Sequence, residues 1–406
     1  MKKKKGFVGI FALLCCCAFI FAGCTTPFSF INNQKNGVYE YTSSSYSENT
    51  TIKTKDDATE SEIAQSYIDI SFTVCITRKV VTVEKNEKNE TVATTTSEDL
   101  HSYGSGFVVR SGGFILTNEH VVSSALADPE TIKIGNKEIT TSYLIYVSQD
   151  GGTTKYPAKL LWENSQVDMA IIVCENFANL PSAKLKDRSV LCSSTEKLQL
   201  LERVITVGNQ KTYYASATTG EITSTLPRVA VSETNIYEHL IQHNASINHG
   251  NSGGALIDTD GYVVGLNTLG DDDANSLFFA VPIYPAMVIL DKVVENYLTT
   301  KSATKEILLG ISAYDSIRSS LINDGTEKFT EKGVKVDTVD SSCIINDLKK
   351  GDIIVGVVIE TSKGILNFNV DDSDTLVYAR MNMIYAQNAT FKVKRGGVIV
   401  NLTINI

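Results

Sequence analysis

The chain has 406 residues, of which 43% are hydrophobic and 20% are charged, and its formal net charge is −9 at pH 7. This composition is typical of a globular protein, and the length allows two or three domains. The negative charge argues against a nucleic-acid partner and offers no basic patch for an anionic membrane surface.

The chain begins with a sequence typical of a signal peptide over residues 1–23. Four lysines precede an apolar run over residues 7–21, which is short for a membrane-spanning helix. The run leads into Ala22-Gly23-Cys24, which resembles the lipobox of bacterial lipoproteins. That resemblance implies cleavage before Cys24 and acylation of this residue, so that lipid anchors the protein to the cell membrane. An ordinary secretory signal or an uncleaved anchor is the alternative.

Residues 24–60 are rich in Ser, Thr, Asn and Lys and show no apolar periodicity, which predicts a flexible tether. A folded domain is expected from residue 61 onward. Residues 68–76 alternate between apolar and polar side chains, which predicts a strand with one buried face. The charged, Thr-rich segment 84–100 predicts a solvated loop.

Short β-like runs separated by Gly and Asn turns occupy residues 101–269, a pattern that favours an all-β barrel or sandwich. The first clear helical pattern covers residues 283–298, where apolar side chains recur on one stripe. A polar linker is expected over residues 299–305. The C-terminal part predicts a mixed unit with several strands and one helix over residues 375–385.

No metal site and no cofactor is expected from the sequence. The acidic run at residues 271–273 lacks the twelve-residue spacing of a calcium loop and predicts a solvated loop. The cysteines outside the leader lack metal-binding spacing and are expected to be small buried hydrophobes. These cysteines are Cys75, Cys174, Cys192 and Cys343.

The segment Gly250-Asn251-Ser252-Gly253-Gly254 directly precedes a strand-like apolar run. A serine between glycines sits on a tight turn with its hydroxyl projecting, because glycine gives the backbone conformational freedom. Backbone N–H groups on such a turn can point together and hold a developing oxyanion. Ser252 is therefore a candidate nucleophile, and a Gly-rich hairpin turn is the alternative.

A serine nucleophile needs a base, and the chain has five histidines. His120 lies at the exit of a strand-like run and is the preferred candidate, with a half-buried structural histidine as the alternative. His249 is a rival because it is three residues from Ser252. However, a neighbour on the same tight turn usually cannot aim its ring at the serine hydroxyl. The less specific histidines are His101, His239 and His243.

The base in turn needs a carboxylate that orients it. Asp168 heads the apolar run VDMAII, and a charge at the start of a buried strand costs several kcal/mol unless it is paired. Asp168 is therefore the preferred acid, with a strand-start turn former as the alternative. Asp128 and Asp150 lie in expected loops and are weaker candidates.

Four strings, GSGFVV, ILTNEHVV, VDMAII and GNSGGALI, occur in this order. As a set they resemble the trypsin-like fold and, more narrowly, the HtrA (Deg) family of serine proteases. The resemblance implies a mainly β protein with a double six-stranded β-barrel over residues 61–300. It implies that His120 is the general base and acid, that Asp168 holds its tautomer and that Ser252 attacks the substrate. The backbone N–H groups of Gly250 and Ser252 would form the oxyanion hole.

Two residues near the nucleophile depart from the family pattern. His249 stands where the family usually has Pro or Arg, and Asn244 stands where it has Asp. Both lie on the segment that shapes the oxyanion hole. The expected substrate pocket has no acidic side chain, which predicts a small or medium apolar side chain before the cleaved bond. The pocket residues are Ile247, Asn248, Asn267 and Thr268.

Residues 305–406 resemble the circularly permuted PDZ domain that follows HtrA proteases, through the strings LLGI, GVKV and DLKKGDIIV. The implied fold of this unit is α+β. The turn Leu309-Gly310-Ile311 would bind the C-terminal carboxylate of a peptide, and a strand edge would pair with the peptide backbone. A PDZ-shaped domain whose groove packs on the protease is the alternative.

Two functions remain open at this point. The first is an extracytoplasmic serine endopeptidase, anchored to the bacterial cell membrane through lipid on Cys24, that cleaves unfolded or damaged exported proteins. The family resemblance also implies a homotrimer. The second is a catalytically latent or inactive chaperone or peptide-binding protein on the same fold, which the departures at His249 and Asn244 favour.

Overall fold

The computed structural model describes most of the chain after the expected tether. The described residues are 52–406, with gaps at 190–195, 210–214, 226–228, 231–235, 238, 271–276 and 316–331. The expected signal peptide, Cys24, Cys192 and the acidic run at residues 271–273 therefore lie outside the described residues. No helix in the part of the chain that the structure describes has the length and hydrophobicity needed to cross a membrane.

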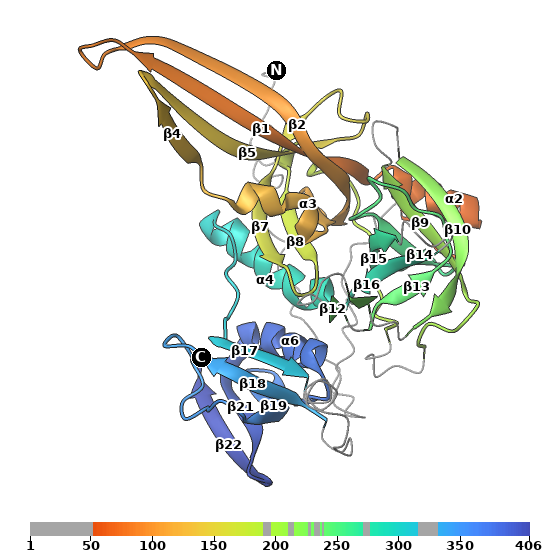
Figure 1. The fold of residues 1–406 in the computed structure, drawn as a ribbon. Helices are drawn as coiled ribbons and strands as arrows, with labels where there is room; N and C mark the ends of the chain where they lie inside the picture. Colours follow the sequence, from red (N-terminus) through yellow and green to blue (C-terminus); the bar gives the residue numbers. More distant parts are fainter. Residues whose placement is uncertain are drawn as a thin grey trace, which may run out of the picture.

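The first part of the fold is a sheet of eight strands within the described residues (Figure 1). These strands are β1 (Ser71–Lys85), β2 (Thr91–Arg110), β3 (Phe114–Thr117), β4 (Glu130–Ile134), β5 (Lys137–Ser148), β6 (Tyr156–Pro157), β7 (Lys159–Asn164) and β8 (Met169–Val173). Their spatial order is β4-β5-β1-β2-β3-β8-β7, with β6 paired to β5. Short helices α3 (Glu119–Val122), η1 (Ser123–Leu126) and η2 (Glu175–Phe177) accompany the sheet, whereas α2 (Glu60–Ile68) lies against the second part of the fold (Figure 1).

The second part is a closed barrel in the order β10-β13-β16-β15-β14-β9. Its strands are β9 (Arg203–Asn209), β10 (Ala215–Ser224), β13 (Ile241–His243), β14 (Ala255–Asp258), β15 (Val263–Gly270) and β16 (Phe278–Pro282), and β11 (Val229–Ala230) pairs with β12 (Ile236–Tyr237) beside it. Helix α4 (Tyr284–Thr300) follows the barrel, close to the predicted helix at residues 283–298. The predicted mainly β fold is confirmed, although the first sheet has eight strands where a six-stranded barrel was expected.

The third part is a separate C-terminal sheet in the order β17-β18-β19-β21-β22, with β20 paired to β19. Its strands are β17 (Ile311–Asp315), β18 (Val334–Val339), β19 (Ile353–Thr361), β20 (Gly364–Asn369), β21 (Ala386–Arg395) and β22 (Val398–Asn405). Helix α6 (Ser373–Asn382) and the turn η3 (Met383–Tyr385) cover it. We call residues 307–406 the C-terminal unit.

Helix α6 lies between two hydrophobic cores and fixes the C-terminal unit on the rest of the chain. Leu376 and Ala379 belong to the core of the C-terminal sheet, whereas Val377, Tyr378 and Met381 belong to the core that includes α4 and the first sheet. Each buried side chain of this size contributes roughly 1.5–3 kcal/mol. The two faces of α6 therefore place the C-terminal unit close to the edge of the first sheet (Figure 1).

The expected solvated loop at residues 84–100 is wrong. Strands β1 and β2 continue through this segment as a long hairpin that projects from the first sheet (Figure 1), and Asn86 Oδ1 accepts hydrogen bonds from the Lys88 and Glu90 amides in its turn. The many β-branched Thr and Val side chains suit a strand. The polar composition was misleading because both faces of this hairpin are solvent-accessible.

The prediction that only one face of this strand is buried is wrong, because Ser71 to Thr77 of β1 are all buried. The polar face of this stretch contacts the closed barrel, where Asn209 Nδ2 donates to Thr73 Oγ1 at 3.0 Å. The chain is already packed at Ile52, which is 2% exposed, so the expected tether over residues 24–60 is docked at its C-terminal end. Among the described cysteines, Cys75 and Cys174 are buried as predicted and Cys343 is half-buried.

Candidate active site

Asp168 occupies a special position between β7 and β8. It has a left-handed backbone conformation, with φ of 47°, and it is 1% exposed. A non-glycine residue in this region is strained, and such strain persists only where the surroundings hold it. Asn118, which precedes α3, donates from Nδ2 to the Asp168 carbonyl at 2.8 Å. The carboxylate is thereby turned toward the residues that follow Asn118.

His120 lies directly against this carboxylate. His120 Nδ1 is 2.9 Å from Oδ1 and 3.0 Å from Oδ2 of Asp168, and the His120 amide also donates to Oδ1 at 3.1 Å. Burial of the ring alone would lower the pKa of His120, but the hydrogen bond and charge of Asp168, helped by Glu119, raise the pKa above its ordinary value of 6.5. The imidazole side chain remains 45% exposed, so its other nitrogen is accessible to a substrate.

Ser252 lies on the loop at residues 250–254 that enters β14. Its hydroxyl donates to the Thr268 carbonyl at 3.0 Å, and no hydrogen bond joins it to His120 among the described residues. The Thr268 side chain hydroxyl donates to Asp168 Oδ2. Thr268 on β15 therefore contacts the serine through its backbone and the aspartate through its side chain, and it connects the two groups.

Ser105 on β2 holds the nucleophile loop from the opposite sheet. It is 0% exposed, its amide donates to the Ser252 carbonyl at 2.7 Å, and its hydroxyl donates to the Gly250 carbonyl at 2.6 Å. The same hydroxyl accepts from the Asn209 amide at 2.7 Å. A Cβ at Gly253 would lie 2.1 Å from the Ser105 carbonyl, so only glycine allows this approach.

The loop leaves two backbone donors available. Gly250 has φ of 101°, a conformation that favours glycine. Within the described part of the chain, neither the Gly250 nor the Ser252 N–H donates to another residue. Two free N–H groups flanking a serine hydroxyl are the arrangement that an oxyanion hole requires.

The other histidines lie elsewhere. His249 is exposed on the loop, and His101 Nε2 is 3.2 Å from Ser124 Oγ. His239 Nε2 is 2.7 Å from Asp372 Oδ2, at the start of α6. His243 is fully buried in the closed barrel, and burial lowers its pKa to about 4, although Asn267 and the Ala245 backbone oppose this.

The residues expected to form the substrate pocket divide into two groups. Asn267 and Thr268 are buried and their side chains are engaged, since Asn267 Nδ2 donates to the Ala255 carbonyl at 3.2 Å and Thr268 bonds to Asp168. Ile247 is 8% exposed, and Asn248 is exposed. Asn244, one of the two departures from the family pattern, accepts from the Glu221 amide at 2.7 Å.

The turn expected to bind a peptide carboxylate begins the C-terminal unit. Leu309 is buried in the core of that unit, and Gly310 has φ of 69°. A Cβ at Gly310 would lie 2.6 Å from the Cys343 amide nitrogen, so the turn is closely packed. Ile311 starts β17, which is the edge strand of the C-terminal sheet.

Sequence reasoning missed Ser105 and the hydroxyl of Thr268. Ser105 lies in the string GSGFVV, between two glycines at the start of an apolar run. Thr268 was assigned only to the pocket. Both act on residues far away in the sequence, so neither contact has a local signature.

Residues 104–266 match the family of trypsin-like peptidase domains. The chain is 30% identical over 201 residues to a probable periplasmic serine protease do/HhoA-like of Haemophilus influenzae, covering 48% of this chain and 38% of that protein. It is 29% identical over 204 residues to the serine endoprotease DegS of Escherichia coli, covering 49% of this chain and 50% of that protein. It is 28% identical over 316 residues to a probable periplasmic serine endoprotease DegP-like of Halomonas elongata, covering 76% of this chain and 57% of that protein.

A solved structure described as the HtrA-type protease AlgW with decapeptide has the same fold. It aligns with a TM-score of 0.51 and 22% identity, covering 82% of this chain and 94% of that chain. The chain spans less than two thirds of the length of the three curated relatives given above. The predicted resemblance to trypsin-type HtrA proteases is confirmed by the sequence matches, and the solved structure confirms the fold.

Proposed function

We propose that the chain, an HtrA-like protein with the trypsin fold, is a serine endopeptidase in which Ser252, His120 and Asp168 act together. The observation that carries this proposal is the contact of His120 Nδ1 with both oxygens of the buried Asp168 carboxylate. That bond fixes the proton on Nδ1 and leaves Nε2 free to accept a proton from the serine. The names of the curated relatives support the same activity.

In the proposed reaction the Ser252 hydroxyl turns from the Thr268 carbonyl toward His120 Nε2. Its oxygen attacks the substrate carbonyl while the proton passes to Nε2, and the negative charge on the carbonyl oxygen is held by the Gly250 and Ser252 N–H groups. The imidazolium then protonates the leaving amine, and the C–N bond breaks. Water attacks the resulting acyl-enzyme by the same route and regenerates the serine.

The test of this proposal compares the wild type with Ser252→Ala on an unfolded model protein such as casein. We expect the variant to lose about 10⁶-fold in kcat, because no other group supplies the nucleophile. Mass spectrometry of the products gives the cleaved bonds, and we expect small or medium apolar side chains before them, next to Ile247. A profile dominated by Arg or Lys would contradict this pocket assignment, and undiminished cleavage by the variant would contradict the triad.

The position of the Ser252 hydroxyl also fits a second function. Because this hydroxyl donates to the Thr268 carbonyl and not to His120, the serine is not activated in this conformation. A latent protein that binds unfolded chains is therefore the alternative. A fluorophosphonate probe separates the two functions when it is applied with and without a peptide that carries a free C-terminus. Labelling under either condition supports the endopeptidase, and its absence under both supports the binding protein.

We propose that residues 305–406 form a PDZ domain that binds peptide C-termini. The turn at Leu309, Gly310 and Ile311 would receive the carboxylate, and the edge of β17 would pair with the peptide backbone. Its position at the edge of the sheet supports this. Fluorescence anisotropy should detect binding of a peptide with a free C-terminus, and the same peptide with an amidated C-terminus is the control.

We propose an extracytoplasmic location with lipid on Cys24, and a protease domain that covers residues 61–300. Relatives whose names call them periplasmic support the location. Intact mass of the membrane-extracted protein should show acyl chains that Cys24→Ala lacks. The homotrimer remains an expectation, which light scattering of the mature protein tests.

A further inference from the structure

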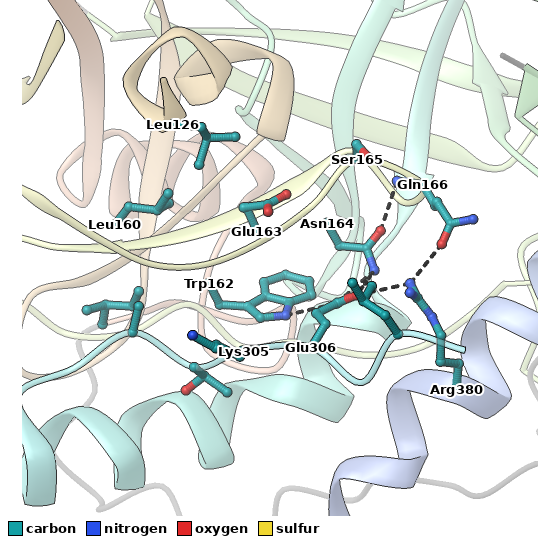
Figure 2. Close-up of a pocket in the computed structure, with 14 residues that line it drawn as sticks. Leu126, Leu160, Trp162, Glu163, Asn164, Ser165, Gln166, Lys305, Glu306 and Arg380 are labelled. Carbon is teal, nitrogen blue, oxygen red and sulfur yellow. Dashed lines mark hydrogen bonds and ion pairs between the residues drawn. The ribbon is translucent and has the colours of Figure 1, made fainter. Parts of the chain in front are cut away.

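The segment between α4 and β17, which includes most of the predicted polar linker, is docked on the first sheet. The Thr304 amide donates to the Leu161 carbonyl of β7 at 2.7 Å, so the segment runs along the outermost strand of the sheet. Two residues later, Glu306 points into the same region (Figure 2). Its side chain is 16% exposed. A carboxylate at this depth is costly unless several donors reach it.

Glu306 receives donors from two parts of the molecule. Trp162 Nε1 lies 3.0 Å from Oε1, and Asn164 Nδ2 lies 2.7 Å from Oε1 and 2.8 Å from Oε2. Arg380, from α6 of the C-terminal unit, places Nη2 3.0 Å from Oε2 and is 10% exposed. Figure 2 shows these groups converging on the carboxylate. The C-terminal unit and β7 are thus joined through one buried charge.

Asn164 transmits this contact to the turn before Asp168. Its Oδ1 accepts from the Gln166 amide at 2.8 Å and from the Val167 amide at 3.3 Å, which closes the turn. Arg380 Nη2 also donates to Gln166 Oε1 at 2.8 Å. The next residue after Val167 is Asp168 with its left-handed backbone. The hydrogen bond from Arg380 therefore reaches this turn at Gln166, two residues before the carboxylate that contacts His120.

We propose that Glu306 and Arg380 are positioning residues for the reaction, because they hold the turn that presents Asp168 to His120. This inference rests on the proposed role of Asp168. A strained backbone relaxes when its supports are removed, and a shift of about 1 Å in a catalytic group can cost about 10²-fold in rate. Glu306 and Arg380 would then act on the reaction only through Asp168, without contacting the substrate.

The contact is open to perturbation. Glu306 and Arg380 line a cavity of about 620 Å³, together with Trp162 and Leu160 (Figure 2). The pair therefore borders this cavity, and a substitution in it can be accommodated without repacking either sheet.

The test measures kcat, KM and the pH profile of kcat/KM for the full mature chain on one unfolded substrate. Glu306→Gln removes the negative charge and places the new amide N–H₂ group among donors that need an acceptor. Asn164→Ala removes the hydrogen bonds that connect Glu306 to the turn, while Glu306 and Arg380 stay paired. For each variant we expect kcat to fall about 10- to 100-fold with KM within about twofold. We also expect the acid limb of the pH profile to move to lower pH, because His120 loses part of its contact with Asp168. A merely structural role would not move that limb.

Trp162 provides an internal readout because it is the single tryptophan of the chain. Its indole N–H bonds to Glu306, so its emission should change in Glu306→Gln. The matched control is Asp372→Asn, which removes the charge from a different contact of the C-terminal unit, the one between Asp372 and His239, and keeps a good helix N-cap. We expect the control to leave kcat, the acid limb and Trp162 emission at wild-type values.

The double variant Glu306→Gln/Asn164→Ala should lose no more activity than either single variant, since both act on one network. Wild-type kcat and an unchanged acid limb in both single variants would overturn the inference, as would an equal loss in Asp372→Asn. Asp168→Asn in the same assay separates the two levels of the argument. If Asp168→Asn is inactive and Glu306→Gln is normal, only the positioning role fails, and if Asp168→Asn is fully active, the proposed triad itself fails.

Discussion

The acid–base half of the candidate site and its nucleophile half are held by different kinds of contact. In the acid–base half, which lies on the eight-stranded sheet, the Asp168 carboxylate is the charged acceptor. It receives hydrogen bonds from the His120 imidazole and from the Thr268 hydroxyl. The loop of Ser252 on the closed barrel is held through backbone carbonyls, by Ser105. Charge-assisted bonds are about twice as strong as neutral ones and depend on protonation. The first half should therefore respond to pH, and the second should respond to packing.

Each half is also completed by a residue of the other. Thr268 belongs to the closed barrel and bonds to Asp168 of the first sheet, whereas Ser105 belongs to the first sheet and bonds to the loop of the closed barrel. The two sheets therefore cannot separate without loss of both halves. This reciprocity explains why the site lies where the two sheets meet.

The largest loss of activity is expected from Asp168→Asn, which disrupts the acid–base half. An amide in place of the carboxylate favours the wrong tautomer of His120, so kcat should fall about 10⁴-fold. The pKa of His120, which Asp168 now raises, should fall as well. Steady-state kinetics against pH measures both effects. A variant that keeps wild-type kcat would show that His120 needs no orienting charge.

Ser105→Ala should break the nucleophile half. It leaves the Gly250 carbonyl and the Asn209 amide without their partner, at a cost of about 1–3 kcal/mol in the free energy of unfolding. Loss of the clamp should lower kcat about 10- to 100-fold and leave the acid limb of the pH profile in place. Urea unfolding and kinetics measure these effects.

The control for Ser105→Ala is Ser71→Ala, since Ser71 is also buried and donates its hydroxyl to the Tyr67 carbonyl away from the loop. It should lose stability and keep kcat. Equal kinetic effects from the two substitutions would show that Ser105 has no special relation to the loop.

Thr268→Val should have a smaller effect because it removes one hydroxyl from Asp168 and keeps the shape and the backbone carbonyl. A hydrogen bond to a charged group contributes about 1.5–3 kcal/mol, so a fall in kcat of about 10- to 100-fold is the upper range. Thr268→Ser should restore most of the activity. Thr206→Val, in the same barrel and bonded only to Thr218 Oγ1 among the described residues, is the matched control.

His243 tests the pH dependence of stability in the closed barrel, and we expect it to have no effect on activity. Its pKa is lowered to about 4 by burial, so the unfolded chain binds its proton more tightly than the folded chain does. Its contribution to stability is complete above pH 6.5 and is lost as the pH falls from 6.5 toward 4, by about 3 kcal/mol in total. Urea unfolding should show this slope in the wild type and a flatter one in His243→Leu. Identical slopes would contradict the buried neutral histidine.

Sequence analysis predicted the general architecture correctly and proposed the candidate site residues, because both depend on local strings. The order of short strands, helix α4 and the apolar run that follows Asp168 were all visible in hydrophobic patterns and turn residues. The strings also singled out His120, Asp168 and Ser252, and the structure brings His120 onto Asp168 while leaving Ser252 on the Thr268 carbonyl.

What escaped sequence analysis was contact between distant segments. The segment at residues 84–100 looked like a loop since its pairing partner is another polar strand. Residues 299–305 were predicted as a polar linker, and their composition gave no sign that the segment docks on β7 or that the next residue, Glu306, pairs with Arg380 far along the chain. Ser105 and Thr268 gained their roles only when the two sheets met. Such contacts follow from tertiary packing and leave no periodic signal.

The most direct measurement of the central claim is the rate of fluorophosphonate labelling of the mature protein between pH 5 and pH 9, with the modified residue mapped by mass spectrometry. Because the pKa of His120 is raised above 6.5, we expect the adduct on Ser252 and a labelling rate that increases through an apparent pKa above 6.5. An adduct on another residue, or a rate that does not change with pH, would contradict a serine activated by His120 and Asp168.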